Sequence, residues 1–173
     1  DYGKGFLTQA FADRICEIVR RSGCLLAVDP HPHTSIVWRG ATAIKPNRLE
    51  AFLAAGLPAS DPVTPALADE PLIEAGRRLV ERWQASHLLV TLGEHGMLLW
   101  DGGEGPSHIP TCAQAVFDVS GAGDTAIAIF TLALASGATA MQAARLANIA
   151  SGIVVGKLGT AAVSAGELRE HIG

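Results

Sequence analysis

The chain has 173 residues, of which 49% are hydrophobic and 17% charged, and its formal net charge is −4. This length and apolar content suffice for one compact domain with a substantial core, which excludes a disordered chain. The longest cationic runs are Arg20-Arg21 and Arg77-Arg78, so the basic patch of a nucleic-acid-binding protein is absent. The most apolar stretch, residues 126–138, is shorter than the ~20 residues of a membrane-spanning helix. We therefore expect neither nucleic acid nor a membrane as a partner.

The first third of the chain predicts a helix followed by two short strands. Residues 24–28 are apolar and end at Asp29-Pro30, which predicts a short buried strand, and residues 41–44 predict a second one. The helix precedes them and stops at residues 20–23, where two arginines are followed by Ser and Gly. Its apolar residues recur at helical spacing: Phe6, Leu7, Phe11, Ile15, Ile18 and Val19.

The middle of the chain alternates helices with strands. Asn47 with Glu50 three residues later predicts the capped start of a helix over residues 48–57. The proline-rich residues 58–71 predict a loop, and the apolar pattern over 73–86 predicts a second helix. Further elements follow in order: a clear buried strand over residues 87–92, then a hairpin of strands 97–100 and 107–110.

The last third is predicted to be helical. Small and apolar residues indicate helices over about 124–136 and 139–156, and Ser164 with Glu167 announces a short final helix. Together with 19 glycines and only 5% aromatic residues, the alternation predicts an α/β fold with a mostly parallel sheet covered on both faces. Ligands of such folds gather at the carboxyl ends of the strands. Unusual loops fall at those ends, at His31, Asn47, Gly93 and Gly121.

Three cysteines, Cys16, Cys24 and Cys112, lack C-x-x-C spacing and cannot all pair within one chain. A reducing, cytoplasmic environment is the simpler interpretation. Cys16 and Cys24 both belong to apolar patterns, so we expect them to be small core residues rather than nucleophiles.

The strongest chemical motif is Gly121-Ala122-Gly123-Asp124, at the start of a long apolar helix. Backbone N–H groups at a helix start lack intrahelical partners and favour an anion, and glycine lets the anion approach closely. Asp124 places a carboxylate beside that anion site, where it can accept a proton from an attacking hydroxyl. The alternative is structural, because Asp near a helix start is ordinary and Gly-Ala-Gly also serves close packing.

A second glycine-containing turn, Thr91-Leu92-Gly93-Glu94-His95-Gly96, follows the clearest strand. It suits either the phosphates and ribose of a nucleotide or an ordinary hairpin turn. Neither G-x-x-x-x-G-K-[ST] nor G-x-G-x-x-G occurs, which excludes the usual P-loop ATPase and nicotinamide dehydrogenase fingerprints.

Residues 118–125, Asp-Val-Ser-Gly-Ala-Gly-Asp-Thr, closely resemble the D-[TV]-[TS]-G-A-G-D signature of PfkB (ribokinase-like) carbohydrate kinases. They come after Asn47-x-x-Glu50 and Thr91-Leu92-Gly93-x-x-Gly96 in the family order. The resemblance covers essentially the whole chain. It implies a ribokinase-like three-layer α/β/α fold, with residues 1–173 as the C-terminal nucleotide-binding and catalytic part of a kinase domain whose N-terminal part is missing.

Within this family, residues 1–5, 38–47 and 154–160 most resemble heptose 7-phosphate kinases. The implied reaction is ATP-dependent phosphorylation of heptose 7-phosphate to the 1,7-bisphosphate, in ADP-heptose synthesis for lipopolysaccharide. Residues 29–33 depart from the pattern, because a lysine-containing loop is expected there. One alternative is another PfkB sugar kinase. A second is that this fragment, taken alone, is a nucleotide-binding module without turnover. A homo-oligomer is a further alternative.

The resemblance also implies roles for single residues. Asp124 is the base, beside an anion hole of Gly121, Ala122 and Gly123. The nucleotide phosphates and ribose contact Thr91, Gly93 and Gly96, while Asn148 and Gly159 border the adenine pocket. Mg²⁺ and its waters are organised by Asn47 and Glu50, and a monovalent cation, expected to be K⁺, by Asp118 and Ser120 with Ser164.

Lys4 and the pair of His31 and His33 are further candidates for binding a ligand. Lys4, in a glycine-flanked loop, suits contact with a phosphate already on the sugar, or is a solvated loop lysine. His31 and His33 have metal-ligand spacing but no obvious third ligand, so a transition-metal site there is not favoured.

Overall fold

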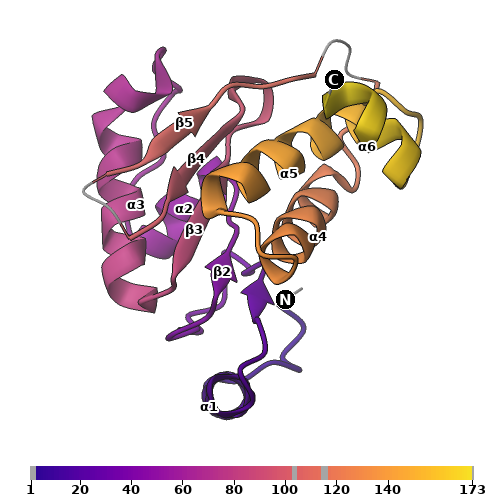
Figure 1. Ribbon diagram of the computed structural model, residues 1–173. Coiled ribbons are helices and arrows are strands. Elements are labelled where there is room, and N and C mark those ends of the chain that lie inside the picture. Colours follow the sequence, from indigo (N-terminus) through magenta and orange to yellow (C-terminus); the bar gives the residue numbers. More distant parts are fainter. Residues whose placement is uncertain (1–2, 103–104, 114–116, 173) are drawn as a thin grey trace. The chain divides into compact units, whose positions relative to one another are not determined.

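The computed structural model describes residues 3–102, 105–113 and 117–172 (Figure 1). The chain divides into two compact units, which are described separately. The sheet unit comprises Asp1–Thr91 and Leu98–His108, and the helical unit comprises Leu92–Met97 and Ile109–Gly173.

A five-stranded sheet in the order β1-β2-β3-β4-β5 confirms the predicted α/β class. β1 pairs in parallel with β2, and β2 in parallel with β3, with Ala43 opposite both Ala27 and His87. Only residues 92–96 separate β3 from β4, too few for the crossover that a parallel pair needs, so this pair is a hairpin. The strands are β1 (Ala27–Val28), β2 (Ala43–Ile44), β3 (His87–Thr91), β4 (Met97–Trp100) and β5 (Ser107–Ile109).

The first helix, α1 (Gln9–Ser22), is confirmed but begins later than its apolar pattern. The Thr8 hydroxyl accepts a hydrogen bond from the Phe11 N–H and caps the helix, so Phe6 and Leu7 lie ahead of it. Phe6 is 81% exposed and contributes nothing to the core. The apolar spacing extended the expected helix back to Phe6 and Leu7, whereas the capping hydroxyl of Thr8 sets where the helix begins.

The structure also corrects the expectation that Cys24 belongs to the core. Cys24 is exposed, whereas Cys16 is buried as expected. Strand β1 covers only Ala27–Val28 instead of residues 24–28, so Cys24 lies in the connection after α1, where Gly23 adopts a left-handed conformation. All three tryptophans are buried: Trp38, Trp83 and Trp100.

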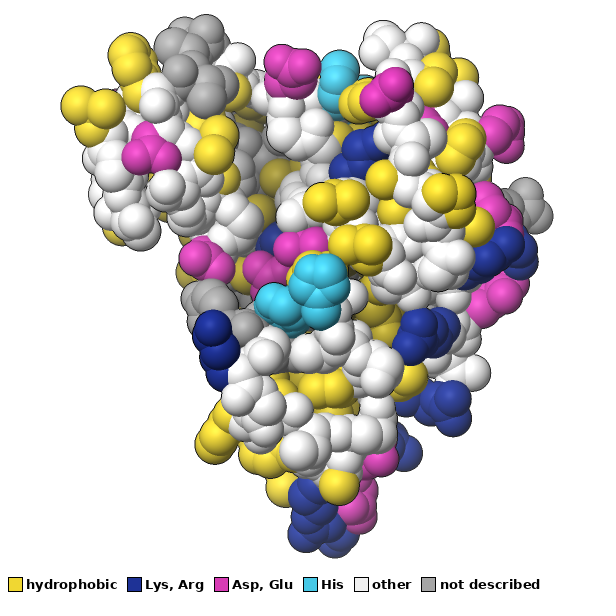
Figure 2. Space-filling view, turned by 180° about the vertical axis from the view of Figure 1, so that it is seen from behind, with side chains coloured by type: hydrophobic (Ala, Val, Ile, Leu, Met, Phe, Trp, Pro, Cys, Tyr) yellow, Lys and Arg dark blue, Asp and Glu magenta, His cyan; other side chains and the backbone are white. Residues whose placement is uncertain are grey.

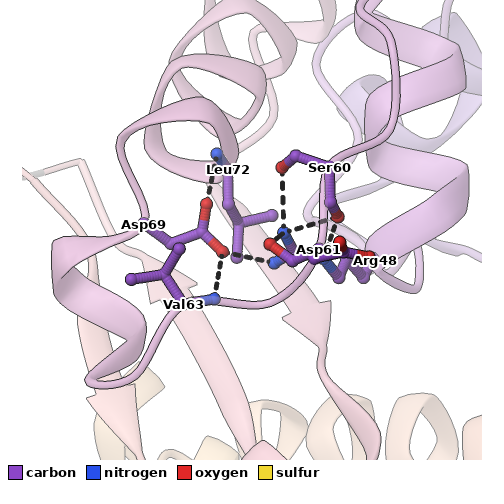
Figure 3. Close-up of polar contacts among 6 residues, drawn as sticks. All are labelled: Arg48, Ser60, Asp61, Val63, Asp69 and Leu72. Carbon is purple, nitrogen blue, oxygen red and sulfur yellow. Dashed lines mark hydrogen bonds and ion pairs between the residues drawn. The ribbon is translucent and has the colours of Figure 1, made fainter.

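Helices α2 (Arg48–Ala55) and α3 (Glu70–Trp83) are joined at their N-termini by a buried ion pair (Figure 3). An Arg48 guanidinium nitrogen lies 2.6 Å from an Asp69 carboxylate oxygen, and Asp69 is 1% exposed. Asp69 also accepts from the N–H groups of Leu72, in the first turn of α3, and of Val63 in the preceding loop. The predicted loop over residues 58–71 is therefore fastened to both helices, with one turn of 3₁₀ helix, η1 (Ala66–Ala68), inside it.

In the helical unit, α4 (Ala122–Ala135) and α5 (Ala140–Val155) lie side by side (Figure 1). Fully buried alanines on α5, among them Ala143, Ala144 and Ala147, allow the close approach. Thr139 and Gln142 form a capping box at the start of α5. The last helix, α6 (Ala165–Ile172), follows the predicted Ser164 and Glu167 pair. No helix in the described part of the chain is long and apolar enough to cross a membrane.

Candidate active site

Two of the predicted site loops meet at the carboxyl ends of β2 and β3. Asn47 forms an isolated parallel bridge with Thr91, and the Thr91 N–H donates to the Pro46 carbonyl at 3.0 Å. Parallel pairing of β2 with β3 forces this meeting, because strands that run in the same direction end at the same edge of the sheet. The expectation that Asn47 and Thr91 share an edge is confirmed.

Asn47 and Glu50 form the predicted capping box on α2. The Asn47 side-chain oxygen accepts from the Glu50 N–H at 2.9 Å, and Glu50 Oε2 accepts from the Asn47 N–H at 2.7 Å. The second carboxylate oxygen of Glu50 has no hydrogen-bond donor among the described residues. Within those residues, no group of three or more His, Cys, Asp and Glu side chains exists that could hold a metal ion. This sparse donor set fits Mg²⁺, which keeps several waters and is held by one or two carboxylates together with phosphates.

The same edge of the sheet carries a buried cation that sequence reasoning missed. Lys45, directly after β2, is 4% exposed, and its ammonium lies 3.1 Å from the Asp29 carboxylate, directly after β1. A buried lysine needs such a partner, because an isolated ammonium loses its hydration at high cost. The sequence signal that could have revealed this buried cation is the position of Lys45 between an apolar strand and Pro46-Asn47.

The candidate ligands near the N-terminus, Lys4, His31 and His33, lie on the sheet unit. Gly3 lies against the ring of His31, and the rings of His31 and His33 are 5.5 Å apart. Figure 2 shows neighbouring histidine side chains on its face of the molecule. Lys4 is exposed in this loop. Its role as a phosphate contact stays a prediction.

The helical unit holds the anion site. Gly121 adopts a left-handed conformation, with φ 81°, and has no side chain to cap α4. Among the described residues, the N–H groups of Gly123 and Asp124 have no acceptor, as expected for the first turn of a helix. Asp124 is exposed in this first turn, and the methyl group of Thr160 covers Gly121. The first turn of α4 thus offers free donors and a carboxylate to one ligand.

Asp118 ties the segment before α4 to the loop after α5. Its carboxylate accepts from the Ser120 N–H at 2.8 Å and from the Gly159 N–H at 3.2 Å. Hydrogen bonds from the Ser120 side chain and backbone, with that from Gly159, hold the pKa of Asp118 below its ordinary value. Ser164 instead pairs with Glu167 at the start of α6. Asp118, Ser120 and Gly159 are therefore brought together.

Gly96 and Asn148 flank the segment that follows β5. A Cβ at Gly96 would overlap the Ile109 carbonyl oxygen. The Asn148 amide, on α5, donates to the Pro110 carbonyl at 2.7 Å and to the Cys112 sulfur at 3.3 Å. Gly96 thus allows the chain to pack closely against residues 109–111, and Asn148 holds residues 110–112 by hydrogen bonds.

A cavity of about 490 Å³ lies in the helical unit next to this segment. One wall is a stripe of α5 residues at i, i+3, i+4 and i+7 spacing, two of which are glycines. Asn148 precedes the stripe, whereas Gly159 is absent from the cavity wall and bonds to Asp118. The lining residues are Cys112, Phe117, Ile149, Gly152, Ile153, Gly156, Lys157 and His171.

The predicted residues thus form two groups. Asn47, Glu50 and Thr91 cluster on the sheet unit, with Lys4 on the same unit. The remaining ones lie on the helical unit: Gly93, Gly96, Asp118, Ser120, Gly121, Ala122, Gly123, Asp124, Asn148 and Gly159.

Comparison with known proteins gives a family match over most of the chain. Residues 9–165 match the pfkB family carbohydrate kinase domain. The bifunctional protein HldE of Desulfatibacillum aliphaticivorans is 42% identical over 172 residues, and that of Geobacter sulfurreducens is 42% identical over 173. These alignments cover 99% and 100% of this chain but 34% of each relative, so the chain spans about a third of the length of these relatives.

Solved structures share the fold. Ribokinase from Arabidopsis thaliana, in complex with ribose and ATP, superposes with a TM-score of 0.78 at 21% identity, covering 94% of this chain and 52% of that one. Phosphofructokinase-2 from Escherichia coli, in complex with potassium, gives 0.76 at 18% identity, covering 95% and 52%. The ribokinase-like fold predicted from the sequence is confirmed.

Proposed function

The chain belongs to the pfkB family of carbohydrate kinases, and we propose that it carries the nucleotide site and the catalytic base of an ATP-dependent sugar kinase. One observation carries the proposal. The start of α4 combines backbone N–H groups at Gly123 and Asp124, which have no acceptor in the described part of the chain, with the exposed carboxylate of Asp124. Phosphoryl transfer to a hydroxyl needs this combination, an anion site for the transferring group beside an acceptor for the proton.

In this mechanism, the glycine turn at Gly121, Ala122 and Gly123 lets the transferring phosphoryl group come close, and Asp124 holds the acceptor hydroxyl. The N–H groups of Gly123 and Asp124 donate to the phosphoryl group, whereas the Ala122 N–H already donates to the Val119 carbonyl at 3.2 Å. The helix dipole stabilises the negative charge that gathers at this position during the transfer. Asp124 acts mainly by orienting the hydroxyl, and the proton leaves late, because the transition state of phosphoryl transfer is largely dissociative. Positioning and charge stabilisation supply most of the rate enhancement.

Asn47 and Glu50 are the proposed holders of Mg²⁺ and its waters. When bound, the ion neutralises charge on the nucleotide phosphates. Both side chains are fixed by the α2 capping box, so their remaining oxygen lone pairs have defined directions. Thr91, Gly93 and Gly96 are the proposed contacts for phosphates and ribose, and the cavity beside Asn148 takes the base.

A monovalent cation site is proposed at Asp118 and Ser120. The lowered pKa of Asp118 keeps its carboxylate charged, as a cation requires. The phosphofructokinase-2 structure that shares this fold contains potassium, which makes K⁺ the ion to test.

We propose heptose 7-phosphate as the acceptor, on the resemblance of residues 1–5, 38–47 and 154–160, and Lys4 as a contact for its phosphate. The cytoplasm is the proposed location, from the cysteine usage. A second candidate is a nucleotide-binding module without turnover. It is favoured by the coverage of only 52% of the solved kinases and 34% of the curated relatives.

Two measurements on the chain separate these candidates. Calorimetry with Mg-ADP tests the nucleotide site, and a coupled assay of ADP release from ATP with heptose 7-phosphate tests turnover. Binding together with sugar-dependent release supports the kinase. Binding without release or sugar-phosphate affinity supports the module, and absence of nucleotide binding contradicts both.

A further inference from the structure

The cavity beside α5 has a volume of about 490 Å³ and a largely apolar wall on α5. Ile149 and Ile153 give it an apolar wall, and Gly152 and Gly156 add no side chains to that wall. Gly152 also allows the opposite segment to come close, because a Cβ there would lie 3.2 Å from the Ala113 nitrogen. Among the described residues, three polar side chains line the cavity, Cys112, Lys157 and His171, so each of them has a large influence on what binds.

Two of the three polar side chains in this lining are engaged elsewhere. The Lys157 ammonium donates to the Ala162 carbonyl at 2.9 Å and pairs with the Glu167 carboxylate. The Cys112 sulfur accepts from the Asn148 amide and is a weak acceptor in any case. His171 remains.

His171 has a defined tautomer. Its Nδ1 lies 2.8 Å from the backbone carbonyl oxygen of Glu167, one turn earlier on α6. A carbonyl oxygen can only accept, so Nδ1 carries the hydrogen and, in the neutral ring, Nε2 is an acceptor. Among the described residues, Nε2 has no hydrogen-bond partner. The ring thus brings one unpaired acceptor to the wall of the cavity.

We propose that His171 selects a 6-aminopurine over a 6-oxopurine in this cavity, by accepting a hydrogen bond from the exocyclic amino group through Nε2. An adenine base presents that amino donor, whereas a hypoxanthine or guanine base presents an oxygen at the same position. Two acceptors facing each other leave both unsatisfied, which costs more than the loss of one hydrogen bond. The inference rests on the proposed function, since it requires that the cavity takes the nucleotide base.

The test is calorimetry of the chain with Mg-ADP and with Mg-IDP, whose bases differ at this position in an amino against an oxo group. ADP is expected to bind roughly tenfold more tightly than IDP. His171→Phe should reduce this ratio to within about twofold. His171→Arg, which can only donate, should reverse the preference toward IDP.

His33→Phe is the matched control, because it removes an exposed histidine of the sheet unit. It should leave the ratio unchanged. Equal wild-type affinities for ADP and IDP, or an unchanged ratio in His171→Phe, would overturn the role of His171 while leaving the nucleotide site intact. If neither nucleotide binds, the proposed function fails and this inference fails with it. His171 is exposed near the end of α6, so its substitution should leave the fold intact, and far-UV circular dichroism checks this.

Discussion

The Gly159 backbone N–H donates to Asp118 Oδ2 at 3.2 Å, although 41 residues separate the two positions. Asp118 belongs to the turn that leads into α4, and Gly159 to the loop that follows α5. This single carboxylate therefore fixes the loop after α5 next to the proposed anion site.

Asp118→Asn should loosen that loop. The amide keeps one acceptor oxygen but cannot receive N–H groups on both sides, so one of the bonds from Ser120 and Gly159 is lost. Exchange of the Gly159 amide hydrogen should quicken, and affinity for Mg-ADP should fall by roughly fivefold. Asp61→Asn is the control, because within the described residues the Asp61 side chain makes no hydrogen bond and its backbone carbonyl accepts from Arg48. If the exchange rate of the Gly159 amide hydrogen does not change, the hydrogen bond from Gly159 to Asp118 does not hold this loop.

The Lys157 and Glu167 pair should make the docking of α6 depend on pH. The hydrogen bond from Lys157, followed by those from Ser164, lowers the pKa of Glu167 from 4.5 to about 2. A group with a lowered folded-state pKa stabilises the fold above its unfolded pKa of 4.5, and this contribution is lost as the pH falls toward 2. Glu167→Gln should therefore lower Tm at pH 6 more than at pH 3, by a small amount because the pair is partly exposed. A Tm difference that does not vary with pH would refute the assignment.

Asp69→Ala should destabilise the sheet unit by about 3 kcal/mol, since it leaves the Arg48 guanidinium partly buried without its carboxylate. Asp69→Asn separates the effect of the ion pair from that of the helix cap, because asparagine still caps α3 but carries no charge. Urea denaturation measures both variants, and Arg48→Met, alone and in the Asp69→Asn background, completes a double-mutant cycle for the ion pair. A loss below about 1 kcal/mol for Asp69→Ala would show that the pair contributes little.

Gly96→Ala should cost roughly 3 kcal/mol or more, because residue 96 has φ 83° and a Cβ there would overlap the Ile109 carbonyl. Gly93 is the matched control in the same turn. Its φ is 58° with nothing within 4 Å of a Cβ, so Gly93→Ala should cost only about 1 kcal/mol. Chemical denaturation of both variants decides this, and equal losses would argue against close packing at Gly96.

The sequence predicted those features whose signals are local. The Asn47 and Glu50 capping box, the Thr139 and Ser164 helix starts, and the glycine turn into α4 depend on neighbours within four residues, and all appear as expected. The Asn47 and Thr91 contact was also predictable, because parallel strands end at one edge.

What the sequence did not show depends on distant partners. The Lys45 and Asp29 pair, the Asp69 cluster and the tautomer of His171 each require knowledge of which atoms lie nearby in space. Cys24 shows the converse error. Its apolar neighbours suggested burial, but β1 is short and the chain enters it along the surface.

The catalytic role of Asp124 is the centre of this account, and ADP release by Asp124→Asn tests it most directly. Wild-type and variant chains are compared in the coupled assay with ATP and heptose 7-phosphate, and Mg-ADP affinity is measured in parallel. We expect turnover to fall by at least about a hundredfold while the nucleotide affinity stays within about twofold. Near-normal turnover in the variant would contradict the account.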